Sequence, residues 1–414
     1  MKSLRVSLGS QSVTECDSAS LDIPFSNTLS TLRGGTFFTS AYSLPSGSGA
    51  AVFLKDRHYN RLVDCYSLLY SRLDFSLTRV SFDAYLDWLL AINPFSKENQ
   101  MQILVVVLGG GAMSQGQEEW SFSNGFEGDV SEILFISQPM SVKPKWSFKY
   151  GINVRTLVYQ RPTARAKPAV YKGGIAGQWE ITCRNVYRML SDYYSMGVDG
   201  RVFKWDVLDS AEKWRLRCLS REVKSGNVDF LRSYSFQSSY FETIIKRWLS
   251  DEKRLSIPEV ETMYMRDIDH DVVFTSSDGG LLEGSTFSLL GLDAQLQWVF
   301  IPLESRHGVI LESTTVYFIK ESLKAASILY SERSVSLDEL PEFKGLFAVS
   351  STRLSIQKDH IHLQRIRRVN GVDVGGDSCV SELSCYRQLT EALSCWMKEY
   401  MKSSLSPYNG VQGV

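Results

Sequence analysis

Apolar residues recur at helical spacing in two stretches of the first third of the chain. In Arg57–Leu73 and in Val80–Ile92 they fall three or four positions apart, which predicts two amphipathic helices. The apolar faces consist of Leu62, Cys65, Leu68 and Leu69 in the first helix and of Phe82, Tyr85, Leu86, Leu89 and Leu90 in the second. The unbroken apolar run Ile103–Leu108 predicts a buried strand. Ala51–Leu54 and the residues after Gly34-Gly35 predict two further strands.

Strands and helices also alternate in the last part of the chain. The pattern predicts strands over Val154–Tyr159, Gly345–Val349 and His360–Val369, and helices over Thr315–Tyr330 and Ser381–Met401. This mixture predicts an α/β (α+β) fold with two domains. We expect a small N-terminal α/β domain at 1–148, a large C-terminal domain at 149–402 and a flexible tail at 403–414.

Residues 173–266 differ in character from the rest of the chain. Charged residues there interleave, at helical spacing, with Trp179, Trp205, Trp214 and Trp248. The pattern predicts a large, mainly helical insertion in the C-terminal domain. Its aromatic and basic side chains are of the kind that form an interface with a protein partner.

Composition excludes several classes of protein. The 414 residues have a formal net charge of −1 and a pI of about 6.6, so nucleic acid is not indicated as a partner. No apolar run reaches the roughly 18 residues of a membrane span, so no membrane partner is indicated. The 7 cysteines are scattered without a C-x-x-C pair, which favours a reducing intracellular compartment over disulfides or zinc.

The first residues and one glycine run each leave two interpretations open. Residues 1–13 are serine-rich with Lys2 and Arg5, which fits either an organelle-targeting segment or a short strand. Cytoplasm, mitochondrion and plastid therefore all remain open. Gly109-Gly110-Gly111 follows a strand, but no third spaced glycine opens a helix after it. A strand-ending turn and a loop to about residue 128 are the better interpretation than a dinucleotide site.

Lys167 and Glu283 are the candidate chemical groups. Lys167 follows the predicted strand Val154–Tyr159 and has Arg161 and Arg165 nearby, and neighbouring cations favour the free amine that Schiff-base chemistry needs. Glu283 lies in an apolar strand after the turn signal Asp278-Gly279, where a carboxylate needs a partner. Either a protonated ring nitrogen or an arginine would satisfy it.

Three elements suit an anion. Arg61 opens a helix, and its planar guanidinium matches a phosphate. Ser313-Thr314-Thr315 precedes an amphipathic helix, where hydroxyls cap backbone N–H groups and where an anion is favoured as well. Ser350-Ser351-Thr352 ends the strand Gly345–Val349. Each alone is also explained by capping, by a loop or by a solvated charge.

The order of these motifs resembles the class IV aminotransferases, the pyridoxal-phosphate proteins of fold type IV. It runs from His58-x-x-Arg61-Leu62 through Arg161-Pro162 and Lys167, then Asp278-Gly279 with Glu283-Gly284-Ser285-Thr286, to the threonine-opened helix and Ser350-Ser351-Thr352. The group includes branched-chain aminotransferases, D-amino-acid aminotransferases and aminodeoxychorismate lyases. The likeness covers most of 21–172 and 267–371.

The resemblance implies a role for each matched residue. Lys167 would form the Schiff base with pyridoxal 5'-phosphate and move protons at the substrate carbon. Tyr171 would contact the ring oxygen of the cofactor, and Glu283 would bond the pyridine nitrogen. The residues implied to hold the phosphate are Arg61, Thr314, Thr315, Ser351 and Thr352. A homodimer is also implied, because the family is typically dimeric.

The chain departs from the family at several substrate-side positions. Thr39 stands where the family has an acid, Ser288 where asparagine is common, and Val316 where arginine is usual. Lys246 and Lys172 are alternative lysines, but neither has both the preceding strand and a tyrosine at the right offset. These departures bear on the substrate more than on the cofactor.

Two functions from different classes follow. The first is a pyridoxal-phosphate-dependent aminotransferase that moves an amino group between an amino acid and a 2-oxo acid, or a lyase acting by elimination on an aminodeoxychorismate-like substrate. The second is a catalytically degenerate aminotransferase fold that serves as a structural or assembly factor, with the insertion at 173–266 as its interface. A basic stretch, whose members are Lys143, Lys145, Lys149, Arg155, Arg161, Arg165, Lys167 and Lys172, also fits the second.

Overall fold

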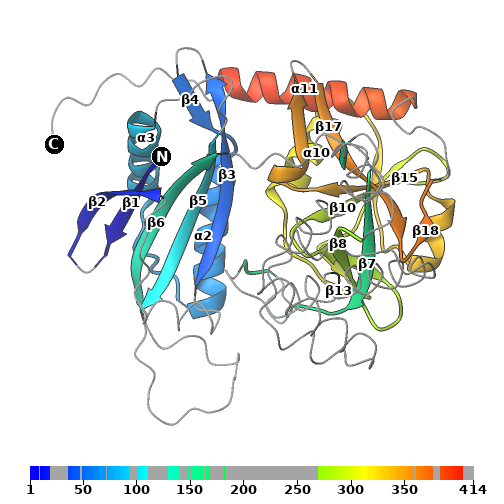
Figure 1. Ribbon diagram of the computed structural model, residues 1–414, viewed down its shortest axis with the longest axis horizontal. Helices are drawn as coiled ribbons and strands as arrows, with labels where there is room; N and C mark the ends of the chain where they lie inside the picture. Colours follow the sequence, from blue (N-terminus) through cyan, green and yellow to red (C-terminus); the bar gives the residue numbers. More distant parts are fainter. Residues whose placement is uncertain are drawn as a thin grey trace, which may run out of the picture.

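The computed structural model places two sheets side by side, each with its own helices (Figure 1). The residues that it describes are 1–8, 10–18, 36–46, 49–70, 72–93, 101–110, 129–139, 147–148, 151–161, 165–167, 181, 269–357, 360–375 and 383–403. Tyr171, Lys172, Lys246, the tail beyond Ser403 and nearly all of the predicted insertion lie outside these residues. None of the described helices is both long and apolar enough to cross a membrane.

The first sheet is antiparallel, with six strands in the order β2-β1-β6-β5-β3-β4. The strands are β1 (Lys2–Ser7), β2 (Ser12–Asp17), β3 (Phe37–Ser46), β4 (Gly49–Val52), β5 (Met101–Gly110) and β6 (Asp129–Pro139). The N-terminal residues thus form a strand that pairs with both β2 and β6. Of the two interpretations of residues 1–13, the strand is the one that the structure shows.

Two helices, α2 (Lys55–Tyr70) and α3 (Arg79–Ile92), cover one face of this sheet. Both predicted amphipathic helices are confirmed, and Thr78 caps α3 by accepting a hydrogen bond from the backbone N–H of Ser81. One residue was assigned to the wrong face: Leu68 is 48% exposed. Tyr66 and Tyr70 are buried instead, and their rings stack against each other on the buried side of α2.

The second sheet is mixed, with ten strands and the main order β14-β11-β10-β15-β17-β7-β8-β9. Its strands are β7 (Ile152–Val158), β8 (Asp271–Thr275), β9 (Leu281–Gly284), β10 (Ser288–Leu292), β11 (Trp298–Phe300), β14 (Tyr330–Glu332), β15 (Gly345–Val349), β16 (Leu354–Gln357), β17 (His360–Val369) and β18 (Val372–Asp373). The short hairpin β12 (Glu304–Ser305) and β13 (Gly308–Val309) stands apart from it.

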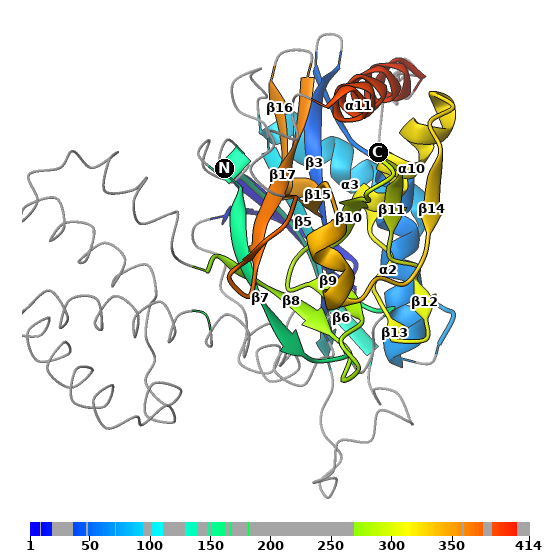
Figure 2. The same cartoon turned by 90° about the vertical axis from the view of Figure 1, so that its right-hand side faces the viewer.

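Two helices, α10 (Thr314–Ala325) and α11 (Ser384–Ser403), pack against each other beside the second sheet (Figure 2). Their buried faces share a hydrophobic core with the β3–β4 hairpin of the first sheet, through Tyr42, Leu44 and Phe53. A separate core lies among β7, β8, β9 and the chain around them. The shared core joins the two halves, so α2 of the first half is held close to the start of α10 in the second.

Two predicted boundaries were wrong for identifiable reasons. The helix from Thr315 was expected to reach Tyr330, but it ends at Ala325. Ser327 adopts a φ of +56°, which a helix does not tolerate, and Tyr330 pairs with Trp298 as an edge strand. Gly109 and Gly110 are not in a loop: they extend β5 across a register shift to Val130 and Asp129.

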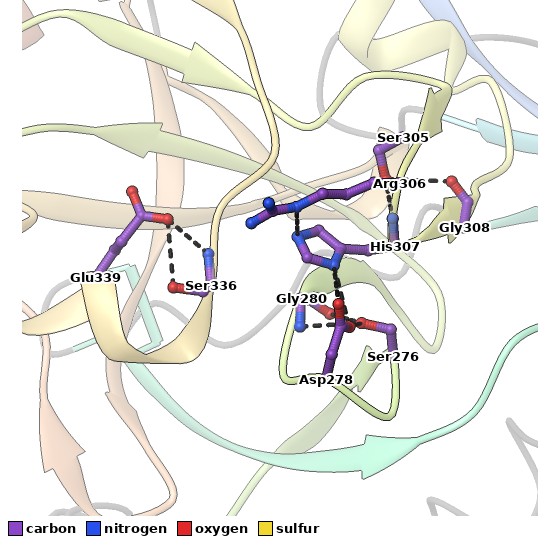
Figure 3. Close-up of polar contacts among 9 residues, drawn as sticks. All are labelled: Ser276, Asp278, Gly280, Ser305, Arg306, His307, Gly308, Ser336 and Glu339. Carbon is purple, nitrogen blue, oxygen red and sulfur yellow. Dashed lines mark hydrogen bonds and ion pairs between the residues drawn. The ribbon is translucent and has the colours of Figure 1, made fainter.

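The predicted Asp278-Gly279 turn is confirmed and is held by a buried histidine from another hairpin (Figure 3). His307 lies between β12 and β13, and its Nδ1 lies 2.9 Å from Asp278 Oδ2. Its Nε2 lies 3.1 Å from Nε of Arg306, which donates, so the neutral ring carries its proton on Nδ1. Gly279 has a φ of +82°, and a Cβ on Gly280 would lie 2.0 Å from the His307 ring.

Gly280→Ala is therefore expected to lower the free energy of unfolding by about 2–3 kcal/mol, because the methyl group overlaps the His307 ring. Gly279→Ala is the matched control, since a Cβ there meets nothing within 4 Å and only the positive φ costs about 1–2 kcal/mol. Urea denaturation of both variants measures the difference. Adding His307→Ala to Gly280→Ala should restore part of the loss, and equal costs for the two alanines would contradict this packing.

Candidate active site

Strand β3 is the element around which the candidate site assembles. The β4 strand pairs only with its far end, Ser43–Ser46, so the edge at Phe38 is open to another segment. That segment carries Lys167: the backbone N–H of Phe38 donates to the carbonyl of Lys167 at 3.1 Å. Ala166 is fully buried in the core beneath α2, and the N–H of Lys167 donates to Cys65 Sγ at 3.2 Å. Both contacts fix the Lys167 backbone against β3 and α2.

The side chain of Lys167 lies among cations and against an aromatic ring. Its Nζ lies 4.5 Å from the centroid of the Phe38 ring. Burial, together with the neighbouring charges of Arg61 and Arg161, lowers the pKa of Lys167 to about 7. Arg165, one of the two expected neighbours, instead forms an ion pair with Glu304 at the surface. The second cation near the Lys167 amine is therefore Arg61 rather than Arg165.

Glu283 has an arginine partner, one of the two that the sequence left open. Its side chain is 5% exposed on β9, and Oε1 lies 3.0 Å from Nε of Arg161. Burial raises the pKa of Glu283 to about 7, while Arg161 and a hydrogen bond from the backbone N–H of Leu311 act in the opposite direction. The Arg161 pair does not fully offset the desolvation of the carboxylate.

Arg61 lies where α2 meets the start of α10. One guanidinium nitrogen, Nη2, donates to the backbone carbonyl of Glu312. A cavity of about 60 Å³ opens beside it, and its lining includes Arg57, Ser313 and Thr314. That volume holds roughly four waters, the size of a phosphate group rather than of a substituted ring.

The predicted cap at the start of α10 is confirmed. Ser313 is the N-cap residue, and its Oγ accepts from the backbone N–H of Val316 at 3.3 Å. Thr314 lines the cavity and Thr315 is buried. The N-terminus of this 12-residue helix, with its partial positive charge, therefore faces Arg61.

The Ser351-Thr352 turn forms the short 3₁₀ helix η6 (Ser351–Arg353), which lies against β3. The structure therefore places Lys167 and this turn beside β3, with Arg61 and Glu283 within electrostatic range of Lys167. The side chain of Thr352 and all of Tyr171 lie outside what the structure describes, so their roles stay predictions.

One departure from the family pattern has a local explanation. Thr39, which stands in place of an acid, has its Oγ1 2.7 Å from Nδ1 of the buried His58. Burial, together with the charges of Arg61 and Lys167, holds the pKa of His58 well below its usual value. The Thr39 hydroxyl can donate to or accept from this ring nitrogen, so it satisfies the buried histidine without adding a charge.

Sequence reasoning underrated Arg161 and missed Cys65 and Phe38 as neighbours of Lys167. Arg161 was considered as a neighbour of Lys167, as part of the Arg161-Pro162 motif and in the basic stretch, but not as the partner of Glu283. The signal was available, because an acid in an apolar strand requires a buried cation. Nothing in the local pattern marks the other residues.

The donor set fits pyridoxal phosphate. The polar groups of the cofactor are an aldehyde, a ring hydroxyl, a pyridine nitrogen and a phosphate. The described residues offer an amine of lowered pKa in Lys167, a buried carboxyl in Glu283, and a guanidinium beside a helix N-terminus. The described residues include no group of three or more potential metal ligands.

Comparison with known proteins identifies the fold. No family model and no curated protein matches the sequence. Solved structures do match: the branched-chain amino acid aminotransferase of Escherichia coli is 13% identical over 94% of this chain and 92% of that chain, with a TM-score of 0.53. A putative branched-chain amino acid aminotransferase of Thermotoga maritima is 14% identical over 96% of each chain, with a TM-score of 0.51.

The chain therefore has the two-domain α/β fold of the class IV aminotransferases, as the motif order predicted. At 13–14% identity the likeness shows the fold alone. Evidence for a function comes from the residues of the site.

Proposed function

We propose that this protein is a pyridoxal-phosphate-dependent enzyme that exchanges an amino group between an amino acid and a 2-oxo acid. The proposal is supported by a partly buried amine of lowered pKa, that of Lys167, which lies within electrostatic range of Arg61, Arg161 and Glu283. A surface lysine would have none of these neighbours. The reaction balances without an external oxidant, because each acid leaves with the nitrogen or the oxygen of the other.

Each residue of the site would have a separate role. The cofactor, when bound, supplies an aldehyde that takes up amino groups and a ring that stabilises negative charge at the adjacent carbon. Arg61 and the N-terminus of α10 would bind its phosphate, and Glu283 would hold the pyridine nitrogen. Lys167 would hold and move the proton at the α-carbon of the amino acid, because its amine is uncharged in part at neutral pH.

Phe38 would support the same amine. Its ring centroid lies 4.5 Å from Nζ of Lys167, and this cation–π contact would hold the lysine side chain in place. A further branched-chain amino acid aminotransferase, with a TM-score of 0.55 and 10% identity, has been solved as a complex with N-(5'-phosphopyridoxyl)-L-glutamate. That protein thus binds a cofactor derivative joined to an amino acid, which supports the proposal for a chain of the same fold.

The reactivity of Lys167 should depend on pH in a characteristic way. Below about pH 7 the amine is protonated and cannot attack an aldehyde, so its capture of pyridoxal phosphate should rise with pH and be half-maximal near pH 7. An ordinary lysine, with a pKa of about 10.4, would become more reactive up to pH 10. Borohydride reduction of the adduct to a secondary amine, followed by peptide mapping, measures the label at each pH.

Lys324 is the internal control, because its amine is exposed on α10 and its pKa is raised by the neighbouring Glu321. Its labelling should be minor at neutral pH and should still increase at pH 9. The proposal would be refuted if Lys167 were labelled no earlier in the pH series than Lys324, or if neither pyridoxal phosphate nor reduction labelled Lys167 at all.

A further inference from the structure

A buried ion pair joins the end of η6 to the first residue of β8. Arg353, the last residue of η6, is 3% exposed, and its Nη2 donates to Oδ2 of Asp271, which is 5% exposed. Its Nη1 donates to the amide oxygen of Gln364. The guanidinium carbon lies 4.4 Å from the centroid of the Phe287 ring. Arg353 is therefore held on three sides inside the second sheet.

Asp271 carries the contacts onward to another part of the site. Its Oδ1 accepts from Ser285 Oγ at 2.5 Å and from the backbone N–H of Val272 at 2.8 Å. The backbone carbonyl of Ser285 in turn accepts from Nη2 of Arg161 at 3.3 Å. Arg161 is the partner of Glu283, so the contacts run without a break from η6 to the carboxyl group.

The carboxylate of Asp271 therefore contacts both the residue that ends η6 and the segment that follows Glu283. The Ser351-Thr352 turn is anchored through Arg353, the residue that follows it, which bends back to donate its backbone N–H to the carbonyl of Ser350 at 2.9 Å. The segment around Glu283 is anchored through Ser285, two residues further on. A movement of Asp271 would displace both.

The stability of the fold does not require the buried Arg353–Asp271 ion pair. Burying two charges is costly, and apolar side chains of similar size often serve stability as well or better. An ion pair, in contrast, fixes direction, because the planar fork of an arginine and the two oxygens of a carboxylate accept few geometries.

We infer that the buried Arg353–Asp271 pair is a positioning element that couples the Ser351-Thr352 turn, a predicted phosphate contact, to the segment that carries Glu283. Arg353 sets the Ser351-Thr352 turn, Asp271 sets Ser285 and through it Glu283, and neither touches the ligand. The inference rests on the proposed function for what is positioned. The coupling itself does not require a bound ligand.

Amide hydrogen exchange in the ligand-free protein tests the coupling. In Arg353→Lys, which keeps the charge but loses the fork, exchange should become at least tenfold faster both in the 349–354 segment and in the 281–287 segment. Ser285→Ala removes one hydroxyl and leaves the Arg353–Asp271 pair in place. It should accelerate exchange only in the 281–287 segment. Arg368→Lys is the matched control, because Arg368 pairs with Asp373 at the surface and should change neither segment.

Ligand binding provides a second readout with pyridoxal phosphate and pyridoxal as probes. Arg353→Lys should weaken pyridoxal phosphate about tenfold more than pyridoxal, which lacks the phosphate, whereas Ser285→Ala should weaken both equally. Acceleration confined to the 349–354 segment in Arg353→Lys would overturn the inference. Wild-type protein that bound neither probe would refute the proposed function alone, because the exchange result is obtained without ligand.

Discussion

Lys167→Ala is expected to abolish amino transfer, with kcat falling by at least about 10³-fold. The amine of Lys167 is the one group at the centre of the described site that can both react with an aldehyde and return a proton to carbon. Wild-type protein with pyridoxal phosphate should absorb at roughly 410–430 nm, and the variant should not. Steady-state kinetics with an amino acid and a 2-oxo acid, together with the visible spectrum, measure both effects.

The matched control is Lys324→Ala, which removes an exposed lysine of α10. It should leave the rate within about twofold and the absorbance unchanged, since exposed substitutions have small effects. If Lys167→Ala kept both the absorbance band and the rate, another lysine would hold the cofactor, and the assignment of Lys167 would be wrong.

Glu283→Gln is expected to lower amino transfer by about 10²- to 10³-fold while raising stability at neutral and higher pH. The activity falls because a neutral amide cannot hold a protonated ring nitrogen by charge. Stability rises because the folded-state pKa of Glu283, about 7, lies above the ordinary value of 4.5. The folded state then binds more protons than the unfolded state between pH 4.5 and pH 7, so wild-type stability falls through that window relative to the glutamine variant.

The gain in the free energy of unfolding should be about 1–3 kcal/mol at pH 8 and should be lost below pH 4.5. Urea denaturation at pH 4, 6 and 8 measures it. Glu399→Gln, at an exposed ion pair with Lys402, should show no such pH dependence. A loss of several kcal/mol at pH 8 with full activity would instead make Glu283 a structural partner of Arg161.

Elements governed by local periodicity could be predicted from the sequence. The spacing of Leu62 and Cys65 placed α2, and the apolar run from Ile103 placed β5, because burial of one face follows directly from the side-chain pattern. The hydroxyls before α10 could be identified as caps for the same reason: the geometry of a cap is local.

The contacts that define the site could not be predicted in this way. Arg353 meets Asp271 across 82 residues, and Arg61 meets Glu312 across 251. No local pattern encodes such pairs; they arise from sheet order and from packing of α2 against the start of α10. The end of α10 was misplaced because Ser327 adopts a positive φ in a stretch whose apolar spacing continued. The motif order supplied the long-range information that periodicity lacks.

The most direct test of the central claim is a crystal structure of the protein grown with pyridoxal phosphate. We expect density continuous with Nζ of Lys167, with the phosphate beside Arg61 and the N-terminus of α10 and the pyridine nitrogen facing Glu283. Density continuous with another lysine, or a phosphate held away from Arg61, would contradict it.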